Sequence, residues 1–251
     1  MKSFEQQIYE LAEVIKKARN ICVFSGAGIS VPSGIPDFRS TGGLYSARDE
    51  SGYSPEEMIS HTFFVQKPGI FYRFYKEKMI YKDARPNIAH RFFPLLEQAG
   101  KQVPIVTQNI DGLHTLAGSK EVFELHGSIY RNYCTTCGTF YGLDEVLSQQ
   151  GVPYCKKDSG IIKPDVVLYE EPLDGDTIQK AVSAIANAEV LIVVGTSLTV
   201  YPAASFVEYF RGKHIAVMNK STTHLDHSAE FVFDCGAEVC TQRLGEILGL
   251  L

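Results

Sequence analysis

Residues 21–30 read Ile21-Cys22-Val23-Phe24-Ser25-Gly26-Ala27-Gly28-Ile29-Ser30, an apolar run that stops at a glycine-containing turn. The run has the length and composition of a buried strand. Glycines in such a turn let backbone N–H groups approach a pyrophosphate at the start of the following helix. The third glycine of the full dinucleotide-binding pattern is absent, because Val31 occupies its position. The stretch indicates a Rossmann-like fold, with a simple strand-to-helix turn as the alternative.

Apolar runs and helical patterns continue to alternate along the chain. Further strands are expected at residues 103–106, 166–169, 190–194, 215–218 and 231–233. Helices are expected at residues 4–19, 55–81, 86–99, 176–188 and 203–210. This alternation is typical of a mostly parallel sheet with helices on both faces.

Residues 128–160 differ in character from the rest of the chain, with short polar pieces, cysteines and glycines. We therefore predict an α/β fold in which a small domain is inserted into a Rossmann-like domain. The Rossmann-like domain is assigned to residues 1–40, 84–128 and 161–251. The small domain, a helical module with a zinc ribbon, is assigned to residues 41–83 and 129–160.

The composition of the 251-residue chain excludes several classes of protein. With 24 Lys and Arg against 29 Asp and Glu, the net charge is -5 and no basic block occurs, which disfavours direct nucleic-acid binding. No apolar run approaches the roughly 20 residues that span a bilayer. The charged first 20 residues do not resemble a signal peptide. We therefore expect a cytoplasmic protein that does not enter a membrane.

Polar side chains follow two further apolar runs. Gln108-Asn109-Ile110-Asp111 comes just after residues 103–106, with His126-Gly127 beyond it, and Gly195-Thr196-Ser197 follows residues 190–194. Ligands of open α/β sheets bind at the carboxyl ends of the strands. These turns and the first glycine turn are therefore expected to meet in one crevice that takes a nucleotide-like ligand.

The stretch Ile35-Pro36-Asp37-Phe38-Arg39 places a carboxylate, an aromatic ring and a guanidinium side by side in a proline-containing loop. Arginine can bind phosphate through its planar fork, and phenylalanine can shield a reactive centre from water. A simple charge-paired loop is the alternative. The Gly- and Ser-containing residues 41–53 that follow are expected to form a lid over the ligand.

Taken together, these motifs carry a resemblance to the sirtuins. The glycine turn, Gly34-Ile35-Pro36-Asp37-Phe38-Arg39, Thr107-Gln108-Asn109-Ile110-Asp111, His126-Gly127, the cysteines and Gly195-Thr196-Ser197 occur in the order seen in that family. The resemblance covers essentially the whole chain, which looks like a bacterial, stand-alone member.

The resemblance implies an NAD-dependent protein lysine deacetylase. The acetyl group of acetyl-lysine is transferred to ADP-ribose, which releases nicotinamide and forms O-acetyl-ADP-ribose. His126 is implied as the general base on a ribose hydroxyl, and the ordinary pKa of histidine, about 6.5, suits that role. Asn109 is the second residue implied in catalysis, since Gln108 and Asn109 are expected to bind ribose hydroxyls and to position His126.

The resemblance also implies the contacts to NAD and to the substrate. Asp111 and the backbone of Ile110 are expected to hold the nicotinamide amide. The phosphates, the adenosine and the rest of the cofactor are expected to contact Gly26, Ala27, Gly28, Asp37, Phe38, Arg39, Gly195, Thr196, Ser197, Asn219, Lys220 and Ala237. Val166, Val167, Leu168 and Tyr169 are expected to bind acetylated protein substrates as an added strand.

Cys134, Cys137 and Cys155 supply most of a zinc ribbon. The family pattern ends in a second Cys-x-x-Cys pair, whereas this chain has Asp158 at the fourth position. A carboxylate can bind zinc, so we predict a structural zinc site that is weaker than one with four cysteines. Loss of the metal, with the ribbon held by packing alone, is the alternative.

Sirtuins that prefer succinyl- or malonyl-lysine carry a Tyr-x-x-Arg pair. The matching stretch here has Tyr72, but Tyr75 stands in place of the arginine. Without that guanidinium an acyl carboxylate lacks its bidentate partner. We therefore predict a preference for acetyl or longer apolar acyl groups over succinyl.

Other functions are compatible with parts of the pattern. A mono-ADP-ribosyltransferase or an NAD hydrolase would share NAD cleavage but change the acceptor, and the presence of His126 argues against both. A non-catalytic module that senses NAD or ADP-ribose would not need the whole polar set. A zinc-ribbon nucleic-acid binder is disfavoured by the acidic net charge. The physiological substrates and the oligomeric state are not indicated by the sequence.

Overall fold

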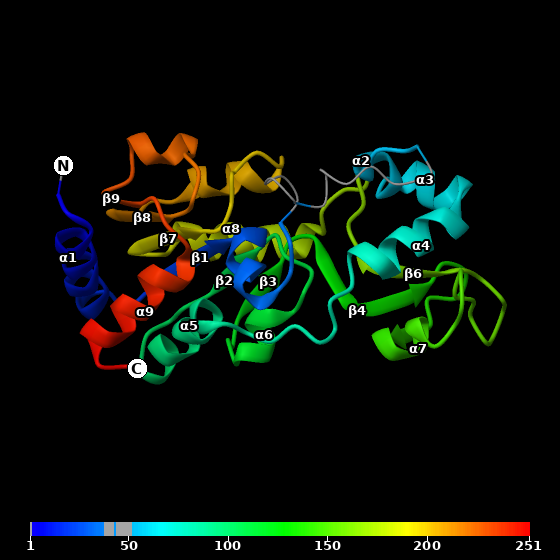
Figure 1. Ribbon diagram of the computed structural model, residues 1–251, viewed down its shortest axis with the longest axis horizontal. Coiled ribbons are helices and arrows are strands. Elements are labelled where there is room, and N and C mark those ends of the chain that lie inside the picture. Colours follow the sequence, from blue (N-terminus) through cyan, green and yellow to red (C-terminus); the bar gives the residue numbers. More distant parts are fainter. Residues whose placement is uncertain (1, 38–42, 44–51) are drawn as a thin grey trace.

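The computed structural model describes residues 2–37, 43 and 52–251. It contains two sheets that lie apart along the long axis of the molecule (Figure 1). The larger sheet has six strands in the order β3-β2-β1-β7-β8-β9, and its neighbouring strands run parallel. Its strands are β1 (Ile21–Ser25), β2 (Ile105–Thr107), β3 (Val122–Glu124), β7 (Val190–Val194), β8 (His214–Met218) and β9 (Phe231–Phe233). The fold class expected from the sequence is confirmed.

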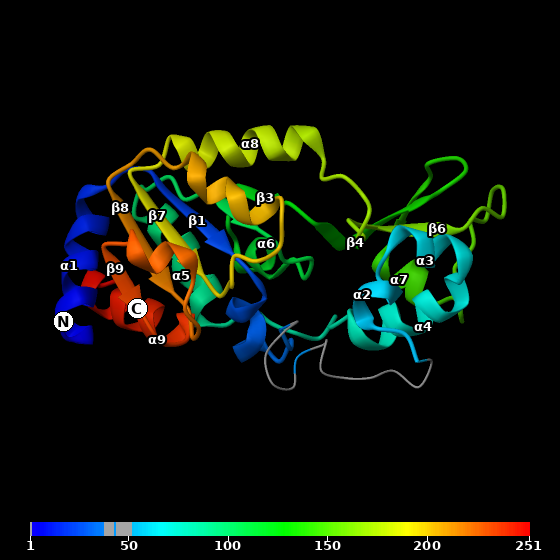
Figure 2. The same ribbon diagram turned by 90° about the horizontal axis from the view of Figure 1, so that it is seen from above.

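Helices cover both faces of this sheet (Figure 2). One face packs against α1 (Phe4–Lys17), α5 (Ile88–Gln98) and α9 (Ala237–Leu248), and the other against α8 (Gly175–Ala186) and η3 (Ala203–Tyr209). The short helices of this part are η1 (Ala27–Ser33), α6 (Leu113–Ala117) and η4 (His224–His227). The strands β1 and β7 are completely buried, because both of their faces are covered.

Helix α1 shows how local sequence sets an element. Ser3 accepts a hydrogen bond from the backbone of Gln6, whose side chain accepts one from the backbone of Ser3, so a capping box starts the helix. Apolar residues at helical spacing, Ile8, Leu11, Ala12 and Ile15, are all buried against the sheet.

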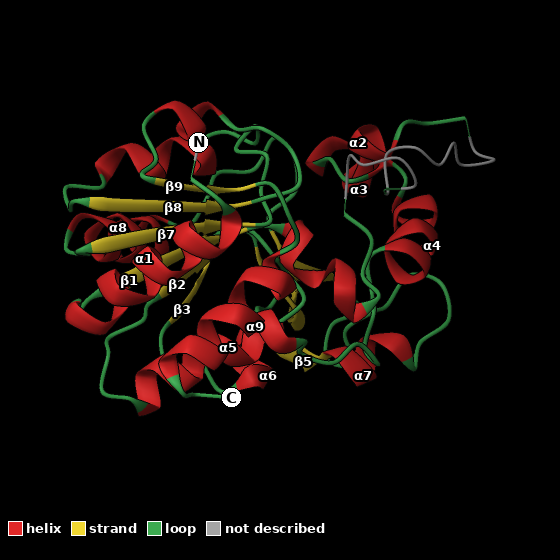
Figure 3. Cartoon of the chain, turned by 60° about the vertical axis from the view of Figure 1, so that its left-hand side comes forward, coloured by secondary structure: helices red, strands yellow, loops and turns green. Residues whose placement is uncertain are grey.

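The smaller sheet has three strands in the order β5-β4-β6, with antiparallel pairing. Its strands are β4 (Gly127–Cys134), β5 (Phe140–Gly142) and β6 (Ile162–Val166), and the helices beside it are α2 (Pro55–Met58), α3 (His61–Gln66), α4 (Pro68–Lys78) and α7 (Leu143–Leu147). Figure 3 shows these helices gathered at the end of the molecule away from the parallel sheet. Among the described residues, no helix combines the length and the apolar character needed to cross a membrane.

The structure corrects two expectations about secondary structure. The single helix expected at residues 55–81 is three helices, since Ser54 and Ser60 each cap a new start and Pro68 begins the third. The strand expected at residues 166–169 is wrong: β6 ends at Val166 and belongs to the antiparallel sheet. Its apolar pattern reflects packing against the small helices rather than a place in the parallel sheet.

Candidate active site

A cleft of about 890 Å³ lies at the carboxyl ends of β1, β2, β7 and β8. The polar turns that follow these strands all contribute to its wall. Of the residues expected to contact NAD, those that line it are Gly26, Ala27, Gly28, Asp37, Gln108, Asn109, Ile110, Asp111, Gly195, Thr196, Ser197, Asn219, Lys220 and Ala237. Phe38, Arg39 and most of the predicted lid at residues 41–53 lie outside the described residues.

Two turns of the cleft touch each other backbone to backbone. The Gly28 N–H donates to the Gly195 carbonyl over 2.8 Å. A Cβ on Gly28 would stand 2.8 Å from the Gly195 Cα, and Gly195 itself has φ 61°, where side chains are disfavoured. The glycines are therefore required for close packing of the turns, in addition to the open phosphate cradle that the sequence suggests.

Gln108 and Asn109 extend from β2 into the cleft region. The Asn109 amide donates to the Gly26 carbonyl and to Ser30 Oγ, both over 3.2 Å, so its orientation is determined by the neighbouring turn. Gln108 Nε2 is buried and has no hydrogen-bond partner among the described residues. A buried donor without a partner is costly, and this one lines the cleft. A hydroxyl-rich ligand such as a ribose would satisfy it.

Asp111 is held by two donors. The Ser30 hydroxyl donates to Asp111 Oδ2 over 2.7 Å, and the Leu113 N–H donates to Oδ1 over 2.9 Å. Burial raises the pKa of Asp111, while the bonds from Leu113 and Ser30 lower it. The carboxylate is thus positioned to accept a hydrogen bond from an amide such as that of nicotinamide.

Behind these residues lies a buried layer that the sequence analysis missed. His114 Nε2 lies 2.9 Å from Ser25 Oγ, and His90 Nε2 lies 3.4 Å from Ser30 Oγ. Since both serine protons are used elsewhere, each imidazole is the donor. Burial lowers the pKa of His90 to about 4 and that of His114 well below its usual range, so both rings are neutral. Ser25 at the end of β1 pairs with Thr107 at the end of β2. These two polar residues, which stand at matching positions at the ends of apolar strands, are the feature of the sequence that could have indicated this buried layer.

His126 stands between β3 and β4 and lines the cleft. Its Nδ1 lies 2.9 Å from the Gln108 carbonyl oxygen, which can only accept, so Nδ1 carries the proton. Nε2 of the neutral ring therefore keeps its lone pair. Burial lowers the pKa of His126, and the bond to Gln108 only partly opposes this. A neutral imidazole beside the cleft can accept a proton near neutral pH.

Gly127 fixes the backbone just after this histidine. It has φ 76°, and a Cβ there would stand 1.8 Å from the Asp165 carbonyl oxygen. Only glycine allows β4 to pair this closely with β6. His126 is thus placed where the two sheets of the molecule meet.

Val166, Val167, Leu168 and Tyr169 form one wall of the cleft. Most of their backbone groups are already bonded within the protein. Val167 N–H donates to the His126 carbonyl, and Tyr169 pairs with Ile59 and His61 on its other side. Leu168 bonds Glu171 through both backbone groups. Within the part of the chain that the structure describes, no hydrogen bond reaches the carbonyl of Val167.

The four predicted metal ligands come together in the ribbon. Their ligand atoms all lie within 4.8 Å of one another. Cys137 Sγ is 3.7 Å from Cys155 Sγ, and Cys134 Sγ is 3.3 Å from Asp158 Oδ1. Two sulfurs on a tetrahedral zinc, with Zn–S of about 2.3 Å, are separated by about 3.8 Å. The donor set and its spacing fit a zinc ion, and the cluster lies away from the residues that line the cleft.

Tyr72 and Tyr75 are not part of the cleft wall. Both side chains are fully buried among the aromatic residues of the small helices, and the Tyr72 hydroxyl donates to the Ile162 carbonyl. The end of α4 instead contributes Lys78 to the cleft, together with Met79, which follows the helix. The preference for apolar acyl groups therefore remains a prediction.

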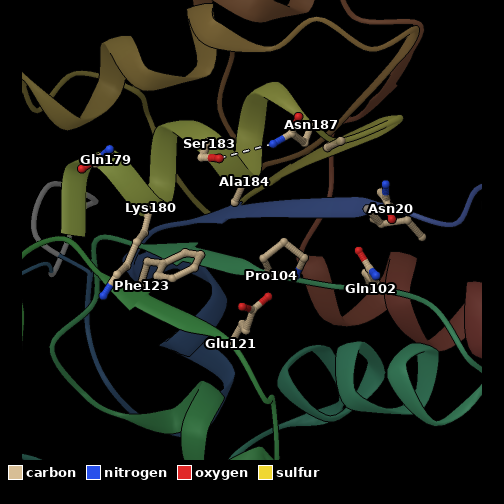
Figure 4. A pocket seen from close by; sticks show the side chains of 12 residues that line it. Asn20, Gln102, Pro104, Glu121, Phe123, Gln179, Lys180, Ser183, Ala184 and Asn187 are labelled. Atoms are coloured by element: carbon tan, nitrogen blue, oxygen red, sulfur yellow. Dashed lines mark hydrogen bonds between the residues drawn. The ribbon is translucent and has the colours of Figure 1, made fainter. Parts of the chain in front are cut away.

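A second hollow, of about 560 Å³, opens at the other end of the parallel sheet (Figure 4). Its wall includes Asn20 and Gln102, which precede β1 and β2, and Lys180 and Ser183 of α8. Ligands of open α/β sheets bind at the carboxyl ends of the strands, so the larger cleft is the better candidate.

Comparison with known proteins gives a consistent result. A model of the Sir2 family matches residues 26–202. An NAD-dependent protein deacetylase from Clostridium perfringens is 50% identical over 246 residues, which is 98% of each chain. A solved Sir2 structure with a deacetylated p53 peptide and 3′-O-acetyl ADP-ribose is 34% identical, with a TM-score of 0.87 over 95% of this chain and 97% of that chain. A Sir2 structure with a p53 peptide and NAD+ has a TM-score of 0.84 at 34% identity, covering 96% and 98% of the two chains.

Proposed function

The chain belongs to the Sir2 family and is an NAD-dependent protein deacetylase, and we propose that His126 is its general base. The observation that carries this assignment is the hydrogen bond between His126 Nδ1 and the Gln108 carbonyl. It leaves Nε2 unprotonated in the neutral ring, inside the same cleft as the glycine turns. The base therefore needs no proton loss before it acts.

The residues of the cleft fit NAD. The unpartnered Gln108 Nε2 is a donor for a ribose hydroxyl, and Asn109 is oriented beside it by Gly26 and Ser30. Asp111 would accept from the nicotinamide amide. The glycine turns and the N-terminus of α9 at Ala237 would hold the phosphates and the adenosine.

When bound, NAD supplies an electrophilic ribose carbon with nicotinamide as its leaving group, and the acetyl group ends on the ADP-ribose product. The protein contributes a proton acceptor and positioning. Nε2 of His126 would take the proton of a ribose hydroxyl, so that this oxygen can attack the carbon derived from the acetyl group. The buried layer of Ser30 and His90 would keep Asp111 in place during the reaction.

The protein binds acetylated peptide substrates, and we propose that they lie along residues 166–169. The open carbonyl of Val167 would accept an N–H of the acetyl-lysine residue. Because the Tyr169 backbone already pairs with Ile59 and His61, the peptide would add to the opposite edge of this segment. Main-chain recognition of this kind explains how different sequences around the lysine are accepted.

Zinc has a structural role, because its four ligands lie in the ribbon and not in the cleft. Hydrogen bonds from Cys137 and the neighbouring groups hold the pKa of Asp158 well below its usual range, so the carboxylate is available as a ligand.

The cytoplasmic location expected from the sequence stays a prediction.

The variant His126→Ala tests the assignment of the base. We expect it to bind NAD with an affinity close to that of the wild type, since the ring is assigned to proton transfer. Deacetylation of an acetyl-lysine peptide should fall about 10²- to 10⁴-fold. NAD binding is measured by calorimetry and acetyl loss by mass spectrometry, with His224→Ala as a matched exposed control. Loss of NAD binding in His126→Ala would show that the histidine is structural.

A further inference from the structure

Glu170 lies at the end of the substrate-binding wall in an unusual conformation. It lines the cleft beside Tyr169, and its φ of 75° lies in the left-handed region that favours glycine. A charged residue with this backbone conformation costs conformational free energy that glycine would not cost. Residues of this kind are often found at functional sites.

The carboxylate of Glu170 is held in one place. The Thr62 N–H, in the first turn of α3, donates to Glu170 Oε2 over 2.8 Å. Hydrogen bonds from the side chain and then the backbone of Thr62 lower the pKa of Glu170, so its carboxyl group is ionised at neutral pH. The residue is also exposed. A solvated and positioned negative charge therefore belongs to a residue of the cleft wall.

The neighbouring Glu171 shows what a purely structural carboxylate looks like in this loop. It lies 3.0 Å from Lys163 Nζ and 2.8 Å from His61 Nδ1, and it accepts the Leu168 N–H. The charge of Glu171 is therefore paired with groups of the protein itself. Within the described part of the chain, Glu170 forms no ion pair with a lysine or arginine.

We propose that Glu170 determines substrate specificity by favouring acetyl-lysine peptides with a lysine or arginine close to the acetylated residue. The inference rests on the proposed function, in which the Val167 carbonyl holds the peptide at this wall. A basic side chain two or three positions away along an added strand comes within reach of Glu170. Electrostatic complementarity of this kind selects among substrates more than it raises affinity overall.

The test compares peptides that differ only at the positions two and three residues from the acetyl-lysine, with arginine, alanine or glutamate on either side. We expect the wild type to show a kcat/KM about two- to fivefold higher for the best arginine peptide than for the alanine peptide, as for an exposed ion pair. Glutamate should be disfavoured. Added salt should reduce the differences.

Two variants separate the effect of the Glu170 charge from the effect of its hydrogen bond to Thr62. Glu170→Gln removes the charge but keeps a side chain able to accept from Thr62, and Glu170→Gly also removes the left-handed strain. Both should bring the arginine-to-alanine ratio close to one. The exposed Glu121→Gln, at the opposite end of the sheet, makes the same charge change and should keep the wild-type ratio (Figure 4).

The outcomes are distinguishable from a failure of the proposed function. Equal kcat/KM for all peptides in the wild type, or an equal fall for all peptides in both variants, would overturn the specificity role and leave deacetylation intact. No NAD-dependent acetyl loss from any peptide would contradict the proposed function, and this inference with it.

Discussion

The active-site cleft and the zinc ribbon are stabilised in different ways. The cleft is built on a six-stranded sheet with a large apolar core on each face. Among the described residues, the buried cluster of the ribbon consists of Cys134, Tyr141, Val146, Cys155 and Ile162, and two of these five belong to the proposed zinc site. A sheet with two cores needs no metal to fold, whereas a ribbon of this size usually does. The chemistry is thus placed on the part of the molecule that is stable by packing.

Removal of one zinc ligand should have the largest effect on this comparison. Cys137 is exposed, so Cys137→Ala removes a ligand without opening a cavity in the core. We expect the zinc content to fall from one per chain to well below one. Amide hydrogen exchange should then lose protection in β4 and β5 while β1 and β7 keep theirs.

The control for this prediction is Cys235→Ala, which changes a half-exposed cysteine outside the metal cluster and should retain zinc. Full protection of β4 and β5 in zinc-free protein would show that the ribbon is held by packing. The contrast between the two regions would then be wrong.

A substitution of the fourth predicted ligand should have a smaller effect and should strengthen zinc binding rather than weaken it. Asp158→Cys converts the site to four thiolates, which zinc favours in structural sites. We expect the zinc of the variant to be removed by a competing chelator about 10- to 100-fold more slowly than that of the wild type. Asp176→Cys, a change of the same type in the first turn of α8, serves as the control. An unchanged rate of removal would argue that Asp158 is not a ligand.

The pH dependence of the reaction tests the protonation state assigned to His126 in the cleft. The base must be neutral, and burial lowers the pKa of His126 below its ordinary value of about 6.5. The kcat/KM should therefore be level around pH 7 and fall only below about pH 6.5, by up to tenfold per pH unit. Zinc content is measured at each pH to separate metal loss from protonation. A fall that begins above pH 7 would contradict the assignment.

Much of this arrangement could be predicted because it follows local rules. Apolar runs ending in polar turns mark the carboxyl edge of a parallel sheet, so Gly26, Asn109 and Thr196 could be placed in one cleft from their positions after strands. Cysteine spacing identified the ribbon. The carboxylate at Asp158 was recognisable only as a departure from a family pattern.

The remaining features depend on contacts between distant residues. The pairing of Tyr169 with Ile59 and His61 joins segments that are far apart in the sequence, so the apolar run at residues 166–169 suggested a strand of the wrong sheet. The hydrogen bonds of His90 and His114 to serines behind the cleft are equally non-local. The left-handed backbone of Glu170 carries no mark in the sequence, because the residue there is not glycine.

The most direct test of the central claim is mass spectrometry of an acetyl-lysine peptide incubated with the protein, with and without NAD. We expect acetyl loss only with NAD, together with one nicotinamide and one O-acetyl-ADP-ribose per acetyl group removed. Free nicotinamide with an intact acetyl peptide would instead indicate an NAD hydrolase or an ADP-ribosyltransferase, and no consumption of NAD would contradict an enzymatic role for the cleft.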